Sequence, residues 1–291
     1  MMQQQQQRLS AAGRAAAGPR PGGACRPAAP RRRATAAAAL VEPGATVLVA
    51  GATGGVGQLV TAKLVERGYR VRAMVRDRAK AARTLGEHPL LELVVADARD
   101  AASLAPAVAG VDAVVCATGT TAFPSARWEG NNGPRPTDLV GPTNLIDATP
   151  RSVGRFVFVT SAGVEREKEM PWRILNLFGV LTLKRQAEAH LQASGLPYTI
   201  LRPSRLTDGP YTSYDLNTLL KGVAGNRQAV TLSGRDDLLG EASRIATAEA
   251  AVQALTLPEA ENRAFALAST AGQGPGGDAS AWRELFARAA P

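Results

Sequence analysis

A glycine-rich turn at residues 46–57 constrains the fold more than any other stretch of this chain. The segment reads Thr-Val-Leu-Val-Ala-Gly-Ala-Thr-Gly-Gly-Val-Gly, so an apolar run breaks at Gly51 and glycines recur at positions 54 and 57. Where a strand turns sharply into a helix, the first glycine permits the turn, the second lets backbone approach a pyrophosphate, and the third lets the helix pack on the strand. The pattern predicts a dinucleotide site.

The helix after this turn explains why an anion would bind there. It would begin near Gly55, where backbone N–H groups without helical partners and the positive end of the helix dipole face the pyrophosphate. A second apolar stretch, residues 70–75, follows soon after, as the motif requires. An ordinary glycine turn is the alternative. We expect the cofactor to be held at Gly51, Thr53, Gly54, Gly55, Val56 and Gly57.

Short apolar strands alternate with helical stretches along the chain. The expected strands are residues 46–50, 70–75, 91–95, 113–117, 156–160 and 198–201. The expected helices between them are residues 58–67, 79–85, 102–109, 138–148 and 175–194. This alternation predicts right-handed crossovers and an α/β fold with a doubly wound parallel sheet, the Rossmann fold.

Beyond Pro203 the pattern loosens, and we expect a small C-terminal region that covers the substrate. It would contain a helix near 214–222, a strand near 229–232, a helix near 242–255 and a strand near 264–268. The glycine-rich stretch 272–277 predicts a flexible break before a terminal helix at 280–289, whose Trp282 and Phe286 would dock on the core. The predicted division is a cofactor-binding domain at 42–270, then the break and helix at 271–291.

The first 41 residues differ in composition from the rest. They contain no acidic residue, no aromatic residue and no lysine, but seven arginines: Arg8, Arg14, Arg20, Arg26, Arg31, Arg32 and Arg33. Such a segment cannot bury enough apolar surface to fold alone, and Arg-rich, acid-free composition is typical of an organelle transit peptide. We predict a disordered address for the chloroplast, with the mitochondrion as the second choice. A secretory signal fits less well, and a disordered tail without a targeting role is the other alternative.

The composition of the remaining chain argues against a nucleic-acid partner, a transmembrane segment and a metal site. The formal net charge of +9 falls to +2 without the seven arginines, so the sequence does not favour a nucleic-acid partner. No run approaches the roughly 18 apolar residues that span a bilayer, so we expect no transmembrane segment. Cys25 and Cys116 give neither a disulfide framework nor a metal-ligand spacing, and we expect no metal.

The residue after the second strand decides which form of the cofactor fits. The strand is followed by Arg76-Asp77-Arg78. An acid there would bind the ribose 2′-hydroxyl of NAD, whereas an arginine accommodates the 2′-phosphate of NADP. Because Arg76 comes first, the sequence favours NADP(H). The alternative is that Asp77 faces the ribose while both arginines lie in solvent.

Two further strand ends would complete the cofactor site at the same edge of the sheet. Asp97, followed by Ala98, comes after the third strand, and its carboxylate could accept a hydrogen bond from the adenine amino group. The fourth strand ends in Ala117-Thr118-Gly119, small residues that let a cofactor approach closely.

These residues together resemble the atypical short-chain dehydrogenase/reductases, in particular the NmrA-like, NAD(P)-binding group of plant and algal plastids. The resemblance covers about residues 46–270 and includes the glycine turn. It also rests on Val75-Arg76-Asp77, Ala96-Asp97-Ala98, residues 156–161, Leu181-Thr182-Leu183-Lys184 with Glu188, and, most specifically, residues 194–203. It implies that Pro203 lies near the nicotinamide ring. It further implies that Lys184 holds the nicotinamide ribose and that Ser161 or Thr160 hydrogen-bonds a substrate.

One departure from this family matters for chemistry. Short-chain dehydrogenases that reduce carbonyls place Tyr four residues before Lys on one helix face, because the lysine lowers the phenol pKa and the tyrosine moves the proton. This chain has Val180 at that place, and valine has no proton to give. Tyr198, Tyr211 and Tyr214 are conceivable substitutes, although core packing or loop contacts explain them more simply. Lys184 could also form only a surface pair with Glu188.

Two functions from different classes fit these observations. The first is an NADPH-dependent oxidoreductase that acts on a small, mostly apolar organelle metabolite. The second is a non-catalytic NADPH-binding protein that assembles or regulates a plastid protein complex. The loss of tyrosine favours the second, and the retained Lys184, Thr160 and Ser161 favour the first. The loop at 123–136 would cover a ligand or meet a protein, and fold alone does not choose between the two.

Overall fold

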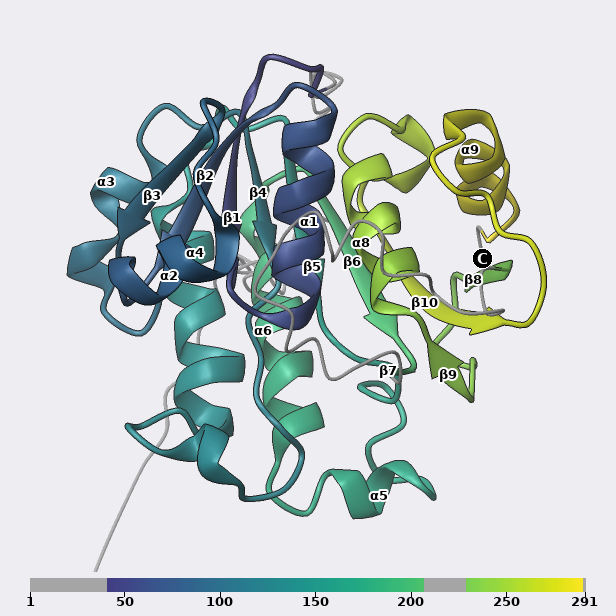
Figure 1. Ribbon diagram of the computed structural model, residues 1–291. Helices are drawn as coiled ribbons and strands as arrows, with labels where there is room; N and C mark the ends of the chain where they lie inside the picture. The colour runs from purple at the N-terminus through teal and green to yellow at the C-terminus, as the bar shows by residue number, and fades with distance from the viewer. Residues whose placement is uncertain (1–40, 207–228, 290–291) are drawn as a thin grey trace, which may run out of the picture. The chain divides into compact units, whose positions relative to one another are not determined.

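The computed structural model describes residues 41–206 and 229–289. Its main sheet has eight strands in the order β3-β2-β1-β4-β5-β6-β10-β8 (Figure 1). These strands are β1 (Thr46–Ala50), β2 (Arg70–Val75), β3 (Leu91–Val95), β4 (Ala113–Cys116), β5 (Arg155–Val159), β6 (Tyr198–Pro203), β8 (Ala229–Ser233) and β10 (Arg263–Thr270). Two short strands, β7 (Arg205–Leu206) and β9 (Glu241–Ala242), pair separately. The predicted doubly wound α/β fold is confirmed.

Parallel pairing dominates the sheet. The seven strands β3-β2-β1-β4-β5-β6-β10 pair in parallel, and β8 alone runs antiparallel, against β10. The strand order reverses between β1 and β4, because the chain runs outward through β2 and β3 and then returns to the other side of β1. In open α/β sheets this reversal opens a crevice at the carboxyl ends of the strands, where ligands bind.

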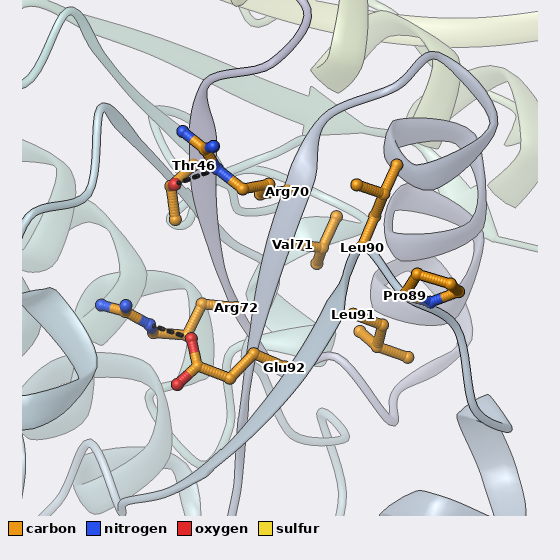
Figure 2. Close-up of a pocket in the computed structure, with 8 residues that line it drawn as sticks. All are labelled: Thr46, Arg70, Val71, Arg72, Pro89, Leu90, Leu91 and Glu92. Carbon is orange, nitrogen blue, oxygen red and sulfur yellow. Dashed lines mark hydrogen bonds and ion pairs between the residues drawn. The ribbon is translucent and has the colours of Figure 1, made fainter.

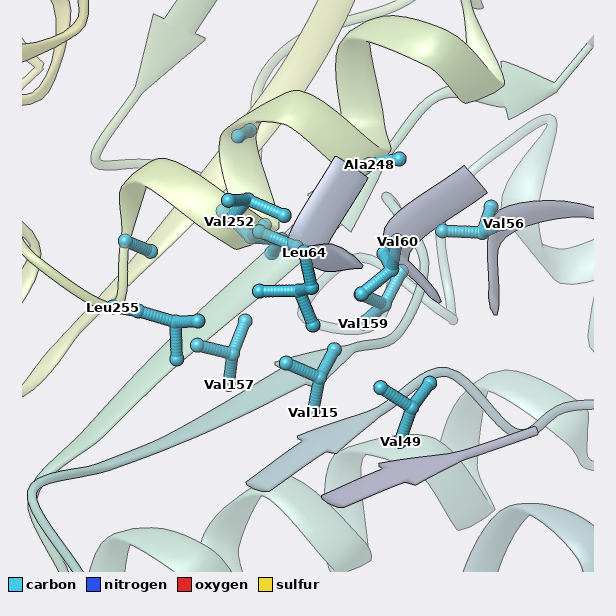
Figure 3. Packing of buried hydrophobic residues seen from close by; sticks show 14 of the residues in the cluster. Val49, Val56, Val60, Leu64, Val115, Val157, Val159, Ala248, Val252 and Leu255 are labelled. Carbon is cyan, nitrogen blue, oxygen red and sulfur yellow. The ribbon is translucent and has the colours of Figure 1, made fainter. Parts of the chain in front are cut away.

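Alternate residues of each strand fill two apolar cores, one on each face of the sheet. Figure 3 shows the first, where Val49, Val115 and Val157 lie beneath α1 (Gly55–Glu66) and α8 (Arg244–Gln253). The second core lies on the opposite face and contains Leu48, Val114 and Phe156 from the same strands. It is covered by α3 (Ala105–Val108), α4 (Gly141–Ala148) and α6 (Val180–Ser194). Because both faces are buried, the strands are continuously apolar rather than alternating.

An ion cluster joins α1 to α8. Glu249 of α8 is buried and accepts hydrogen bonds from Lys63, at 2.9 Å, and from Arg67. Burial alone would raise the pKa of Glu249, but the charges and hydrogen bonds of the two cations lower it. This cluster holds the first helix, and therefore the glycine turn at its start, against the C-terminal part of the fold.

The terminal helix docks as predicted. Helix α9 (Ala279–Arg288) buries Trp282 and Phe286 in the first core, with the ring of Phe286 5.0 Å from that of Phe265. At the other end, Val41 is also buried in this core, and its carbonyl accepts a hydrogen bond from Tyr69 at 3.0 Å. Val41 is the last residue of the predicted transit peptide, so the packed domain includes it. Residues 1–40 of the predicted transit peptide and the helix expected near 214–222 lie outside the described residues.

The structure corrects three predicted helices. The helix expected at 102–109 is divided into a 3-10 turn, η1 (Ala101–Ser103), and the short helix α3. The helix expected at 175–194 is interrupted, because α5 (Trp172–Leu175) ends and α6 starts only at Val180, after Gly179 with a φ of 77°. The side-chain oxygen of Asn176 accepts from Leu181 N at 2.9 Å and caps α6. The helix expected at 138–148 begins earlier, as a π-helical turn, η3 (Arg135–Val140), ahead of α4. The remaining described elements are α2 (Arg78–Leu85), η2 (Ala126–Trp128) and η4 (Pro258–Ala260).

Within residues 41–206 and 229–289, no helix is long and apolar enough to cross a membrane. The same described part of the chain holds no group of three or more His, Cys, Asp or Glu that could bind a metal ion.

Candidate cofactor and substrate site

The glycine turn has the backbone geometry that its sequence predicts. Gly51 has a φ of 79°, and a Cβ there would lie 2.7 Å from the carbonyl oxygen of Ala117. A Cβ on Gly57 would lie 2.0 Å from the carbonyl oxygen of Gly51, so α1 can pack here only without a side chain. Real Cβ atoms do not approach other atoms this closely, and both positions therefore require glycine.

The N-terminus of α1 is open to an anion. Gly54 is the N-cap, and no side chain among the described residues caps this end of the helix. A Cβ on Gly54 would meet only the carbonyl oxygen of Gly51, at 3.1 Å, so the space in front of the turn stays clear. Backbone N–H groups and the helix dipole suit the pyrophosphate there, and the turn fits a dinucleotide cofactor.

The turn lies at the point where the strand order reverses. Ala117 N donates to Ala50 O at 2.9 Å, which brings the ends of β1 and β4 together. Ala117 and Thr118 are half-buried beside Gly51. These are the small residues that were expected to line the cofactor, and they lie at the crevice where the fold places its ligands.

At the end of β2, the acid and the arginines have different tasks. Asp77 is the N-cap of α2, and its carboxylate accepts from Lys80 N at 2.9 Å. Arg78 donates to the carbonyl of Leu93 at 3.1 Å. Arg76 is exposed, and its guanidinium donates to the side-chain oxygen of Asn132. The Asp77 carboxylate therefore caps α2, whereas the Arg76 guanidinium extends toward the crevice on the side of the loop that contains Asn132.

The structure pairs Asp97 with a residue that the sequence analysis missed. Arg99 binds both carboxylate oxygens of Asp97, with the closest contact at 2.5 Å. This hydrogen bonding holds the pKa of Asp97 below its usual value. Asp97 was expected to accept from adenine, but its carboxylate already has a partner. Ala98 is buried beside Gly141: a Cβ added to Gly141 would lie 3.2 Å from the Cβ of Ala98. The spacing Asp97-x-Arg99 directly after a strand is the signal that could have predicted this pair.

Lys184 lies in a buried ion pair at the other end of the crevice. Its Nζ is 2.5 Å from Oδ1 of Asp138, and Lys184 and Asp138 are 7% and 1% exposed. A Cβ on Gly119 would lie 3.1 Å from the same Nζ, so the lysine reaches the end of β4. The alternative of a surface pair between Lys184 and Glu188 is wrong. That Lys184 holds the nicotinamide ribose stays a prediction.

The sequence analysis did not single out Asp138. It lies in the π-helical turn η3, and π-helical turns recur at functional sites. Its Oδ1 also accepts from Thr120 N at 3.4 Å, and its Oδ2 has no hydrogen-bond partner among the described residues. The sequence signal for Asp138 was weak, because it stands at the start of an expected helix, where acidic residues are common without any functional role.

Val180 stands where the resemblance places it, one helical turn before Lys184. It is buried with Ala162, Val164, Trp172 and Leu181 in a small apolar cluster. The side chain is therefore a packing residue. Valine offers no acid, and its neighbours fill the space beside it.

The structure separates the two hydroxyls expected to hold a substrate. Thr160 is buried and donates to Glu188 at 2.5 Å, and Glu188 also pairs with Arg202 at 2.6 Å. The Thr160 hydroxyl is thus used inside the fold, which corrects the expectation that it could contact substrate. Ser161 is half-buried, and the next residue donates its N–H to Pro203 O at 2.9 Å. Ser161 and Pro203 therefore lie together at the ends of β5 and β6.

An exposed apolar surface adjoins this lysine end. The rings of Phe123 and Trp128 pack edge-on against Phe178, with centroids 6.2 Å and 5.4 Å away. Phe123 and Phe178 stay largely exposed, as do Met170, Ile174 and Leu177. Beneath the surface, Ala122 and Leu175 pack on the cluster that contains Val180. Most of the large apolar side chains that the described residues expose gather here.

A hollow of about 300 Å³ lies at the opposite edge of the sheet. Figure 2 shows its lining, which includes Thr46, Arg70 and Leu91, the first residues of three strands, and the ion pair between Arg72 and Glu92. Because the glycine turn follows the last residue of β1, this hollow is separate from the crevice and plays no part in the site.

Known proteins match most of the chain. A protein-family model described as NAD(P)H-binding matches residues 51–258. An uncharacterised chloroplastic protein of Arabidopsis thaliana is 35% identical over 85% of this chain and 76% of its own length. Sanguinarine reductase of Eschscholzia californica is 31% identical, over 84% of this chain and 95% of its own. The photosystem II assembly factor Ycf39 of Cyanophora paradoxa is 27% identical, over 77% and 64%.

The fold also matches solved structures. A putative NAD-dependent epimerase/dehydratase from Bacillus halodurans superposes with a TM-score of 0.65 and 23% identity, over 84% of this chain and all of that one. At this identity the match shows the shared Rossmann fold.

Proposed function

The chain belongs to the NAD(P)H-binding, atypical short-chain dehydrogenase/reductase family, and on that premise we propose that it is an NADP(H)-dependent oxidoreductase of the chloroplast. The observation that carries the proposal is the buried pair of Lys184 and Asp138, whose ammonium lies against Gly119 in the cofactor crevice. A buried charge pair costs desolvation free energy, so its place beside a ligand crevice favours a functional role.

The arrangement at the end of β2 supports NADP(H) over NAD(H). Asp77, the acid that could bind a ribose 2′-hydroxyl, is engaged as the N-cap of α2. Arg76 remains exposed at the crevice, and a guanidinium forms strong, charge-assisted hydrogen bonds with phosphate. The comparisons establish a nicotinamide cofactor and leave its form to this proposal.

Each residue near Lys184 would have its own role toward the substrate or the cofactor. When bound, the cofactor supplies a hydride from its nicotinamide ring. Asp138 fixes the position of the Lys184 ammonium through their 2.5 Å contact, and Lys184 would donate hydrogen bonds to the nicotinamide ribose. The Ser161 hydroxyl, which donates to the Ala162 carbonyl at 3.1 Å, would exchange that partner for a polar substrate atom. Since Val180 carries no transferable proton, the proposal assigns proton delivery to water.

The exposed apolar surface supports a substrate of mostly apolar character. Phe123, Phe178 and Leu177 adjoin the cluster that holds Val180, and small-molecule sites are lined mainly by apolar and aromatic side chains. The enzyme relative, sanguinarine reductase, shows that a chain of this kind can be a reductase. A small apolar metabolite of the chloroplast is therefore the proposed substrate class.

A second function is favoured by one observation. Val180 is closely packed in its cluster, so the usual acid is absent and its space is filled. The chain would then bind NADPH without catalysis and act in assembling or regulating a plastid protein complex. One relative is named as a photosystem II assembly factor, and this name supports the second function.

Substrate-dependent oxidation of NADPH distinguishes the two functions. The purified protein is incubated with NADPH and a panel of apolar aldehydes and ketones, and absorbance of the reduced cofactor is followed. The enzyme proposal expects turnover that Lys184→Met removes and that Lys80→Met, a change of an exposed lysine on α2, leaves intact. NADPH binding without oxidation across the panel would support the non-catalytic function.

A further inference from the structure

The contact between Arg76 and Asn132 occupies the guanidinium that the cofactor needs. Arg76 stands at the end of β2, and its only hydrogen-bond partner among the described residues is the side-chain oxygen of Asn132, while its charge also acts on the Asp97 carboxylate. Asn132 belongs to a loop at residues 126–133, which we call the Asn132 loop. Resting on the proposed use of NADP(H), we propose that Asn132 competes with the cofactor's 2′-phosphate for Arg76 and so limits the preference for NADPH.

Hydrogen bonds within the Asn132 loop hold the Asn132 side chain in position to compete with the 2′-phosphate for Arg76. Its residues Gly130 and Asn131 both have left-handed backbone, with φ of 65° and 63°. Asn132 N donates to Trp128 O at 3.1 Å, and its side-chain amide donates to Glu129 O. With its amide nitrogen used in this way, the side chain presents its oxygen toward Arg76.

Arg99 fastens the same loop to the end of β3. One nitrogen of its guanidinium donates to the carbonyls of Gly130 and Asn131, at 2.9 Å and 2.8 Å, and to the Asn132 side-chain oxygen at 3.0 Å. Its other nitrogens bind Asp97, which neutralises its charge. Arg99 is therefore a positioning residue for the loop, and the cationic charge available to a phosphate belongs to Arg76.

The competition affects the two cofactors differently. A phosphate dianion forms stronger hydrogen bonds with a guanidinium than a neutral amide oxygen does, so the phosphate displaces Asn132. Breaking the hydrogen bond between Arg76 and Asn132 costs free energy, and this cost lowers the affinity for NADPH. NADH carries a 2′-hydroxyl, which does not need Arg76, and it binds without displacing Asn132. Asn132 therefore weakens NADPH binding selectively.

Equilibrium titrations of purified protein with NADPH and NADH, followed by cofactor fluorescence, test this inference. We expect Asn132→Ala to tighten NADPH binding about three- to tenfold, the value of one hydrogen bond, and to leave NADH within about twofold. Asn132→Asp places a carboxylate on Arg76 and should weaken NADPH binding on the order of tenfold. In an Arg76→Ala background, neither substitution should change NADPH affinity. Thermal melts confirm that each variant is folded.

The outcomes separate this inference from the proposed cofactor. If Asn132→Ala weakens NADPH binding, Asn132 assists the phosphate and the inference is overturned. If Arg76→Ala removes the NADPH preference but both Asn132 variants bind NADPH as the unmodified protein does, the inference fails and the proposed use of NADP(H) stands. If the unmodified protein binds both cofactors equally and Arg76→Ala changes nothing, the proposed cofactor fails, and the inference with it.

Discussion

The two ends of the cofactor crevice are built in opposite ways. At the phosphate end, the guanidinium of Arg76 is exposed and holds a neutral amide oxygen that an anion can replace. At the lysine end, Lys184 and Asp138 hold each other out of water. An exposed pair can exchange partners at little cost, whereas a buried charge cannot lose its partner without a large penalty. We therefore expect the phosphate end to set the affinity for the cofactor and the lysine end to set the geometry in which it is held.

The glycine turn joins these two ends, and breaking it should have the largest effect. In Gly57→Ala, the new Cβ would lie 2.0 Å from the carbonyl of Gly51, so α1 must move away from the strand. We expect cofactor binding to fall below detection in a titration and stability to drop by about 1–3 kcal/mol, as for an overpacked core. Gly44→Ala is the control for lost stability alone: alanine is strained at its φ of 92° but meets no atom within 4 Å, so this variant should lose stability and still bind the cofactor. If Gly57→Ala binds NADPH normally, the turn does not hold the cofactor.

Breaking the buried pair should have the next largest effect. Asp138→Ala leaves the Lys184 ammonium buried without its partner, and we expect a loss of about 3–5 kcal/mol in the free energy of unfolding, measured by urea denaturation. Replacing both residues with apolar ones, as in Asp138→Leu with Lys184→Met, should recover most of that loss. A double variant as unstable as Asp138→Ala would show that packing, and not the unpaired charge, causes the loss.

Restoring the family's acid should cost stability. Val180→Tyr adds a ring to a cluster already filled by Trp172 and Val164, and we expect it to destabilise the protein by about 1–3 kcal/mol. Reductase activity should not rise, because the phenol cannot reach the crevice in a relaxed geometry. Val180→Phe, which adds the same ring without the hydroxyl, is the control. A stable tyrosine variant with new activity would mean that the site lacks only an acid.

The glycine turn, Arg76 and Lys184 could be predicted from the sequence, but the partners of Asp97 and Lys184 could not. Gly51 and Gly57 were predictable because their roles depend on backbone a few residues away. The contact between Lys184 and Asp138 joins residues 46 positions apart, and no local pattern encodes it. The α5–α6 break was missed because the apolar residues keep a helical spacing across it. Only Gly179, in a left-handed conformation, and the cap by Asn176 mark the stop.

The smallest expected effect concerns pH and the phosphate end. The hydrogen bonds from Arg99 lower the pKa of Asp97, so this pair is intact at neutral pH and is lost only as pH falls through that lowered pKa. Between pH 8 and 5 the Asn132 loop therefore stays fastened. A phosphate monoester with a second pKa near 6 gains a proton in this range, so NADPH affinity should fall a few-fold while NADH affinity stays level. Parallel titrations at both pH values check this, and an equal fall for NADH would refute it.

The central claim is that this chain binds NADP(H) through the glycine turn and Arg76. Calorimetric titration of the unmodified protein and of Arg76→Ala with NADPH and NADH tests it most directly. We expect the unmodified protein to bind NADPH about ten- to a hundredfold more tightly than NADH, because of the charge-assisted bonds to the 2′-phosphate, and Arg76→Ala to bind the two alike. Equal affinities in the unmodified protein, or a preference that survives Arg76→Ala, would contradict it.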